Sequence, residues 1–505
     1  MKQKTIFRAV FSVTGVILIA KLAGFVKQMV TASTFGATIE TDLVQLAQTF
    51  VGNIQYVLVQ TLLTSFVAVY IHTREDSEEA GKHFAMDVGK IFTLIAACLS
   101  AAMWLLAPWI ARLIAPSYSA ERSAQLTGYL RIFAPALLLF VWIAVFQALL
   151  DANKRFVPGQ MEGLNQSIIL IFFVMIFAKQ LGVQTLVLAF FAYTIWNTLF
   201  LGVLSRRYWG LSRGNPFRNP AVRRLLRMIA PLLLGYAMIY INQQVDKILA
   251  SGLEAGTVTA LGYAAVLTNL VNTFITAFAS ILFTYVTARI SRGEHEAAAG
   301  LTARSASLML LVFLPISALT VLCAEDIVSV AFGRGAFGAD SVHLTARALA
   351  GYGFTFAPLV LKELYSRFQY GYQDTRRPMV NSSIGIAANI ALSIALCPRL
   401  GVFGITAASS VSVCICGILN MVTARRRNGA IRCGALLRQL PFLAAGTAVC
   451  VAVVLLGGRL WGGQPPLLRF LLSVLCGGAG YLLTVSPLLV RLLREGGLAA
   501  FRDAR

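Results

Sequence analysis

The chain has 505 residues, of which 58% are hydrophobic and only 13% are charged, and its formal net charge is +22. Ordinary globular proteins are about 45–50% apolar and about 25% charged, so the composition excludes a disordered chain and argues against a soluble enzyme. A strongly basic soluble protein would suggest nucleic acid as a partner. The apolar content instead predicts a protein of the lipid bilayer with no nucleic-acid partner.

Fourteen apolar segments follow one another along the chain. Each is long enough to cross about 30 Å of hydrocarbon, which takes about 20 residues. The first segment is too long for the apolar region of a signal peptide and has no A-x-A cleavage site, so we expect it to be the first membrane helix. The segments are 7–32, 42–71, 88–114, 126–150, 159–178, 183–205, 228–252, 257–288, 304–331, 343–370, 378–397, 402–424, 436–457 and 468–490. They predict an all-α polytopic membrane protein with 14 transmembrane helices.

Basic residues test the orientation of these helices, because cytoplasmic connections are enriched in lysine and arginine. With the N-terminus inside, the inside connections hold 29 of the 43 basic residues and the outside connections hold only 7. One missed helix would exchange inside and outside and remove this asymmetry. We therefore expect both termini to be cytoplasmic, with the multi-pass chain in the cytoplasmic membrane.

Short motifs recur in the same order about 220 residues apart. Phe133-Ala134-Pro135 recurs as Phe356-Ala357-Pro358, and Leu181-Gly182-Val183 recurs as Leu400-Gly401-Val402. An even number of spans in each copy relates the copies by an axis along the membrane normal. The repeat predicts two parallel-related six-helix lobes followed by two further helices.

The lobe boundaries follow from the repeat and from composition. An arginine-rich stretch at 206–227 also contains glycines and prolines, and it reads as a linker between the lobes. We expect an N-terminal lobe at 1–215, a C-terminal lobe at 216–430, and the last two helices with a cytoplasmic C-terminus at 431–505.

Two lysines in the first span are the leading candidates for a binding site. A charge within the membrane costs about 2.5–3.5 kcal/mol on insertion scales, so it needs a cavity, a partner or a nearby interface. Lys21 and Lys27 are six residues apart and do not share one helical face. A bend at Gly24, which lies between them, would turn both toward one cavity. Snorkelling toward the interface and pairing between the lobes are the alternatives.

Other polar residues within the spans allow two interpretations each. Arg367 follows Glu363 by four residues, so it forms an internal ion pair or contributes to a cavity. Asp246 follows Asn242 and Gln243 on one helical face. These oxygen atoms suit Na⁺ or a proton relay, and they also suit a polar contact between helices.

Motifs of enzymes are absent from the sequence. It contains no G-x-x-x-x-G-K-[ST], no H-E-x-x-H and no G-x-S-x-G, so neither a P-loop nor these hydrolase sites are indicated. We expect a transporter driven by an ion gradient or the membrane potential, not an enzyme. A Na⁺ or H⁺ coupling ion is the only expected cofactor.

Three motifs carry a resemblance to a known family. They are the stretch Ser366–Pro378 (S-R-F-Q-Y-G-Y-Q-D-T-R-R-P), the loop Phe332–Phe337 (F-G-R-G-A-F), and Phe35-Gly36-Ala37 followed by Thr41-Asp42. The sequence resembles the MurJ (MviN) family, which comprises the lipid II flippases of the multidrug/oligosaccharidyl-lipid/polysaccharide (MOP) exporter superfamily. The resemblance implies a V-shaped pair of lobes around a cationic cavity, with a groove for the undecaprenyl tail at the last two helices.

The resemblance also assigns roles to individual residues. The family's S-R-x-x-G-x-x-R-[DE] stretch falls on 20–28, where Lys21 and Lys27 replace the arginines and Gln28 replaces the acid. Lysine keeps a charge for a diphosphate but lacks the bidentate geometry of arginine. Asp246 matches an acid of the family's ion site, and Asn389 is a weaker match.

Two family arginines have no counterpart. Their positions fall on Gln55 in the second span and on Val266, which follows Tyr263-Ala264-Ala265. The exact cargo therefore stays open at the level of sequence.

We expect a flippase that carries the undecaprenyl-diphosphate-linked peptidoglycan precursor, lipid II, to the outer leaflet by alternating access. Lys21, Lys27, Gln28, Asp42 and Arg367 are the expected cargo-binding residues, with Asp42 gating or positioning the lysines. Membrane lipid and the cell-wall synthesis machinery are the expected partners.

Other function classes stay open. The cargo could be another lipid-linked oligosaccharide of the O-antigen or teichoic type, or a drug-like cation, although seven basic residues within the spans disfavour a cation. A membrane glycosyl or phosphoglycosyl transferase would need acidic metal ligands at the membrane face, and no D-x-D pair occurs. A scaffold without transport would leave the buried charges of the first span unexplained.

Overall fold

The computed structural model describes residues 3–210, 214–427 and 433–494, and all regular elements in these ranges are helices. The chain forms two compact units. Unit 1 comprises Met1–Thr259 together with Gly335–Phe337, and unit 2 comprises Ala260–Arg334 together with Gly338–Arg505. The all-α architecture predicted from the apolar segments is confirmed.

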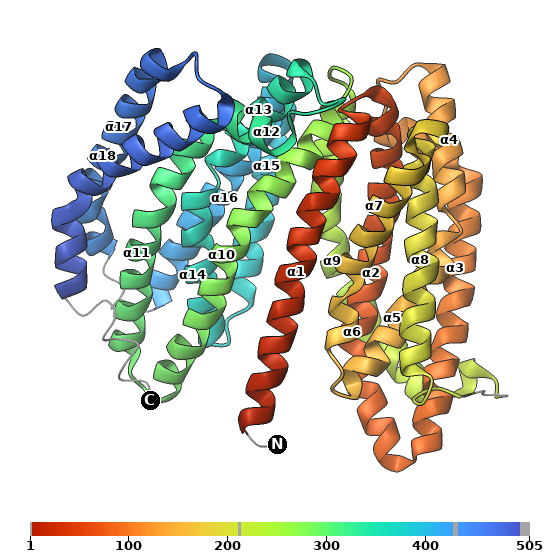
Figure 1. Ribbon diagram of the computed structural model, residues 1–505. Helices are drawn as coiled ribbons and strands as arrows, with labels where there is room; N and C mark the ends of the chain where they lie inside the picture. The colour runs from red at the N-terminus through yellow and green to blue at the C-terminus, as the bar shows by residue number, and fades with distance from the viewer. Residues whose placement is uncertain (1–2, 211–213, 428–432, 495–505) are drawn as a thin grey trace. The chain divides into compact units, whose positions relative to one another are not determined.

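Unit 1 contains a bundle of long helices in which α1 packs on α7, α2 packs on α5, and α5 and α7 both pack on α8 (Figure 1). α9 packs on α2 and α3. The elements are α1 (Gln3–Phe35), α2 (Ile39–Asp76), α3 (Glu78–Ile114), α4 (Ala120–Phe133), α5 (Ala136–Ala152), α6 (Val157–Gln160), α7 (Glu162–Leu181), α8 (Gln184–Ser205), the 3-10 helix η1 (Pro216–Arg218) and α9 (Pro220–Ser251).

Unit 2 is organised around α14 and α16, with α15 against α16 and the last two helices, α17 and α18, packed on each other (Figure 1). Both α17 and α18 also contact α11. The elements are α10 (Thr257–Ser291), α11 (His295–Leu322), α12 (Ala324–Phe332), α13 (Ala339–Gly353), α14 (Phe356–Gly371), α15 (Arg376–Leu400), α16 (Val402–Arg427), α17 (Cys433–Trp461) and α18 (Pro466–Arg494).

The outer faces of many helices are apolar, as a lipid environment requires. Large side chains such as Trp109, Met175 and Leu483 are at least 72% exposed. The core of unit 1 is aromatic, and Phe133 and Phe140 both pack edge-on against Phe190. Eleven helices in the described ranges are long and apolar enough to cross a membrane, or up to 13 spans if each of two bent pairs counts as one.

The 14 spans predicted from sequence are not confirmed by this count, which is based on helix length and apolar composition. Each predicted segment nevertheless falls on one helix or on two consecutive helices. The segment outside the 13 is 228–252, which falls on α9. Asn242-Gln243-Gln244 and Asp246-Lys247 interrupt the apolar character of this segment.

The internal repeat is visible in the backbone. Gly182 and Gly401 end α7 and α15 with φ values of 54° and 60°. Lys154 and Gln373 are the two non-glycine residues with positive φ in the described chain, and they are separated by the same 219 residues as the two glycines. A positive φ is uncommon for a side-chain-bearing residue, so this coincidence supports the repeat independently of the motifs.

The repeated Phe-Ala-Pro motif lies at the two bends. α4 and α5 meet at 40° around Ala134 and Pro135, and α13 and α14 meet at 42° just before Phe356. Proline removes a backbone donor and favours such a break. The boundary between the compact units lies at Thr259, whereas the repeat predicts lobes divided at 215/216. The predicted lobe division therefore stays a prediction.

Candidate functional site

The two candidate lysines lie on one unbroken helix, because α1 continues through Gly24 without the expected break. A side chain at Gly24 would approach Ser167 of α7, so this glycine lies where the two helices meet. Lys21 is exposed, whereas Lys27 and Gln28 are half-buried. The two lysines therefore have different surroundings, as their spacing of six residues indicates.

Lys27 is held by a neutral partner. Its Nζ donates to Oε1 of Gln166 on α7 over 3.2 Å. No carboxylate in the described ranges lies within ion-pairing distance of this ammonium group. A half-buried cation without a counter-charge is suited to an anionic ligand, because a ligand charge would replace what the protein does not provide.

Asp42 joins the start of α2 to the start of α10. Its two carboxylate oxygens accept hydrogen bonds from the backbone N–H groups of Gly256 (2.8 Å) and Thr259 (2.7 Å). The side chain is 2% exposed and satisfies donors that the first turn of a helix cannot satisfy itself. Burial, and to a smaller extent the Asp42 carboxylate, raise the pKa of Tyr118 in the neighbouring loop. The structure thus gives Asp42 the geometry of a helix cap, and its expected contact with cargo stays a prediction.

Two of the motif loops meet in unit 1. The N–H of Ala336 donates to the carbonyl oxygen of Ser33 over 2.8 Å. Gly36 and Gly335 have φ values of 66° and 62°, and a Cβ on Gly36 would lie 2.6 Å from the carbonyl oxygen of Ala336. Glycine is required at both positions because the backbones approach too closely for a side chain. The F-G-A and F-G-R-G-A-F motifs are therefore in direct backbone contact.

Gly335→Ala is expected to destabilise this contact, because its Cβ would overlap the carbonyl oxygen of Ser33 in a strained conformation. Strain of this kind costs about 1–3 kcal/mol, so the thermal midpoint of the purified protein in detergent should fall. Gly338→Ala is the matched control, since Gly338 lies in the same loop with open space around its Cα and φ of −74°. Equal midpoints for the two variants would contradict the role given to Gly335.

Arg367 forms an ion pair on its own helix. Its guanidinium lies 3.5 Å from Oε2 of Glu363, and Lys362 lies 3.9 Å from the other oxygen of the same carboxylate. Two cations share one acid here, and Nε of Arg367 is a buried donor for which the described residues offer no acceptor. The ion pair is therefore present, and it leaves positive charge and an N–H donor for a further partner.

The two residues expected to hold a coupling ion lie in different units. Asp246 is half-buried on α9 of unit 1. Asn389 is 2% exposed on α15 of unit 2, where its Nδ2 donates to Ser409 over 2.9 Å and its Oδ1 accepts from Ser393. Within the described ranges, no group of three or more His, Cys, Asp or Glu side chains could hold a metal ion. The ion site stays a prediction.

Polar contacts between distant helices are the feature that sequence analysis missed. Gln55, where the family carries an arginine, donates to Glu162 of α7 over 3.3 Å. In unit 2, Gln369 and Asn381 both bond to α16 residues Asn420 and Thr423. Polar residues within apolar segments signalled such contacts, but not their pairing. Val266, the other position without the family's arginine, is half-buried on α10.

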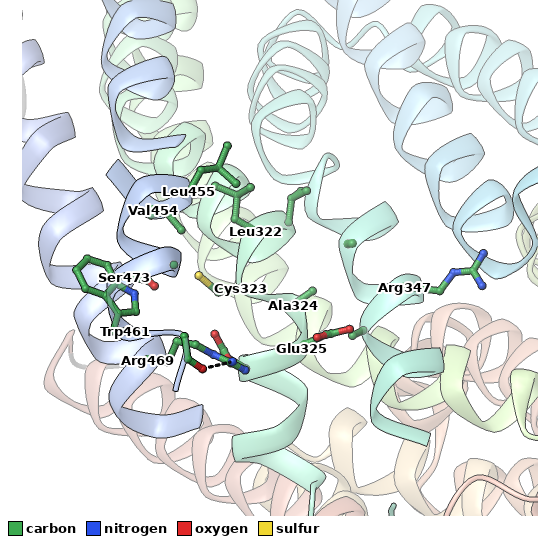
Figure 2. Close-up of a pocket in the computed structure, with 16 residues that line it drawn as sticks. Leu322, Cys323, Ala324, Glu325, Arg347, Val454, Leu455, Trp461, Arg469 and Ser473 are labelled. Atoms are coloured by element: carbon green, nitrogen blue, oxygen red, sulfur yellow. Dashed lines mark hydrogen bonds and ion pairs between the residues drawn. The ribbon is translucent and has the colours of Figure 1, made fainter. Parts of the chain in front are cut away.

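A cavity of about 450 Å³ lies in unit 2 between the α11–α12 junction, α13 and the last two helices. Figure 2 shows Val454 and Leu455 close to Leu322, and Trp461 beside Arg469 and Ser473. Arg469 of α18 bonds to Asp326 of α12. The groove for an undecaprenyl tail expected at α17 and α18 stays a prediction.

Comparison with known proteins identifies the family. The family model described as "Lipid II flippase MurJ" matches residues 31–466. The probable lipid II flippase MurJ of Rhizobium tropici is 26% identical over 468 residues, which is 89% of this chain and 86% of that protein. The lipid II flippase MurJ of Burkholderia cenocepacia is 22% identical over 442 residues, covering 84% of each chain.

Solved structures show the same fold. A lipid II flippase MurJ in an inward closed conformation matches with a TM-score of 0.80 and 18% identity, over 95% of this chain and 99% of that chain. An inward-facing multidrug MATE transporter of the MOP superfamily matches with a TM-score of 0.65 and 14% identity, over 83% of this chain and 98% of that chain. The fold is therefore that of the MOP exporters. Since the family model spans most of the sequence, this multi-pass membrane protein belongs to the MurJ family of lipid II flippases.

Proposed function

We propose that this protein moves lipid II from the cytoplasmic to the outer leaflet of the bacterial cytoplasmic membrane by alternating access. Membership of the MurJ family supports this cargo. The observation that carries the proposal is the environment of Lys27, a half-buried cation whose ammonium group has the neutral Gln166 as its one partner among the described residues. A diphosphate would supply the missing negative charge.

The remaining site residues divide into two roles. In unit 1, Lys21 supplies further positive charge, with Gln28 beside Lys27 as a neutral hydrogen-bonding group. In unit 2, Arg367 is the candidate for contacting the cargo. Asp42 has a structural role, because its hydrogen bonds to Gly256 and Thr259 hold the start of α10 against the start of α2. An ion gradient or the membrane potential drives transport, and Asp246 and Asn389 are the candidates for contacting a coupling Na⁺ or H⁺. Both termini lie in the cytoplasm, as the distribution of basic residues predicts.

Bacterial cells depleted of their own lipid II flippase provide the test. Expression of this protein should restore growth, and the Lys21→Ala/Lys27→Ala double variant should fail to do so at equal membrane abundance. Lys179→Ala is the matched control, because Lys179 is an exposed lysine at the end of α7. No growth with the unaltered protein would contradict lipid II as the cargo. Equal growth with the double variant would contradict the lysine roles and leave the cargo assignment intact.

A further inference from the structure

Unit 1 contains a cavity of about 380 Å³ that is lined by residues of α2, α5, α6 and α7. This volume lies within the range of about 300–1,000 Å³ that small-molecule sites occupy. We call it the glutamine cavity, and its lining residues are Gly52, Gln55, Tyr56, Val59, Gln60, Gln147, Gly159, Gln160, Glu162 and Gly163.

The lining is rich in neutral hydrogen-bonding groups and contains no lysine, arginine or histidine. Each of its four glutamine side chains offers both donors and acceptors, and Glu162 offers acceptors. Polar side chains among membrane helices carry a cost and mark functional surfaces. A diphosphate is disfavoured here, because Glu162 would repel it and no cation would balance it. A neutral ligand bearing hydroxyl and amide groups matches the lining.

The internal repeat provides a comparison within the same chain. Gln147 follows Phe146 on α5, and its counterpart in the repeat, Gln369, follows Phe368 on α14. Gln369 is fully buried and its Nε2 bonds to the Asn420 carbonyl (3.0 Å) and to Thr423 (3.1 Å). Gln147 instead lines the cavity. Gln147 is also largely buried, at 7% exposure, and packs against Gly159 of α6. The same position thus contacts α16 in unit 2 and borders the glutamine cavity in unit 1.

The glutamine cavity lies close to Lys27 along α7. Glu162 lines the cavity, and Gln166, four residues later on the same helix, holds the Lys27 ammonium group. Four residues advance an α-helix by about 6 Å and return to nearly the same face. A sugar bonded directly to a diphosphate requires neighbouring neutral and cationic subsites of this kind.

We propose that the glutamine cavity binds the sugar ring attached to the diphosphate of the cargo, while Lys27 binds the diphosphate. This inference rests on the proposed function and adds the part of the protein that distinguishes a saccharide-bearing lipid from the bare carrier. Tyr56, which is 44% exposed at the cavity and packs 5.0 Å from Tyr240, supplies an aromatic wall for the apolar face of the ring.

Binding to the purified full-length protein in nanodiscs tests the assignment, with undecaprenyl diphosphate and lipid II as the two ligands. Gln60→Leu and Gln160→Leu should each weaken lipid II binding by about fivefold, the effect of one lost hydrogen bond. Both should bind undecaprenyl diphosphate within twofold of the unaltered protein. Lys27→Ala should weaken both ligands.

Gln48→Leu is the matched control, because Gln48 lies half-buried on α2 outside the cavity and donates to the carbonyl oxygen of Leu186. It should bind both ligands normally, and retained undecaprenyl diphosphate binding shows that each cavity variant is folded. Unchanged lipid II binding by both cavity variants would overturn the inference and leave the proposed function standing. If the unaltered protein binds neither undecaprenyl diphosphate nor lipid II, the proposed function is overturned and this inference with it.

Discussion

Replacing Asp42 with alanine is expected to destabilise the protein by about 2–4 kcal/mol, because it removes a helix cap and leaves two buried N–H groups without acceptors. These are the backbone donors of Gly256 and Thr259. In detergent solution the thermal midpoint should fall by roughly 5 °C or more. Asp42→Asn should lie between alanine and the unaltered protein, since an amide keeps one acceptor and places a donor against the second N–H.

Glu40→Gln provides the control for this prediction. Glu40 is an exposed acid in the same first turn of α2, so its loss tests the general effect of removing negative charge near the helix start. We expect a change within 0.5 kcal/mol. An Asp42→Ala protein as stable as the Glu40→Gln protein would show that the carboxylate does not act as a cap.

Arg469→Ala is expected to cost about 2–3 kcal/mol, because it leaves the carboxylate of Asp326 buried without its cation. Asp326 is only 7% exposed, and the pair joins α12 to α18. Neutralising both partners, in Asp326→Asn/Arg469→Gln, should recover most of the loss. Thermal unfolding of Asp326→Asn, Arg469→Gln and the double variant measures the coupling between the pair.

The exposed pair between Lys82 and Glu78 serves as the comparison. The side chain of Glu78 is 76% exposed, and exposed ion pairs contribute about 0.2–1 kcal/mol. Lys82→Ala should therefore have a much smaller effect than Arg469→Ala. If the double variant is as unstable as Arg469→Ala alone, the unpaired charge of Asp326 is not what destabilises the Arg469→Ala protein.

The sequence predicts the helices well, because the length of an apolar segment is set by the bilayer and can be counted. The repeat could also be found, and the matching positive φ values at Lys154 and Gln373 support it in the backbone. The unbroken α1 shows the limit of this reasoning. Gly24 suggested a bend, but α1 continues through it without a break where it faces Ser167 of α7.

Pairings between distant polar residues could not be predicted. Lys27 and Gln166 are 139 residues apart, and Asp42 and Gly256 are 214 residues apart. Periodicity indicates which face of a helix is apolar, but it does not show which neighbouring helix that face meets. The charge within the first span selected Lys27, and the family resemblance added Asp42. Only the fold shows that Lys27 has a neutral partner and that Asp42 caps a helix.

Translocation in reconstituted vesicles tests the central claim most directly. Lipid II is placed in one leaflet of proteoliposomes, an ion gradient or membrane potential is imposed, and arrival in the other leaflet is followed with a reagent that cannot cross the membrane. The unaltered protein should move lipid II, and Lys27→Ala should slow this at least tenfold while Lys179→Ala does not. No movement above protein-free vesicles, or equal rates for the unaltered and Lys27→Ala proteins, would contradict the account.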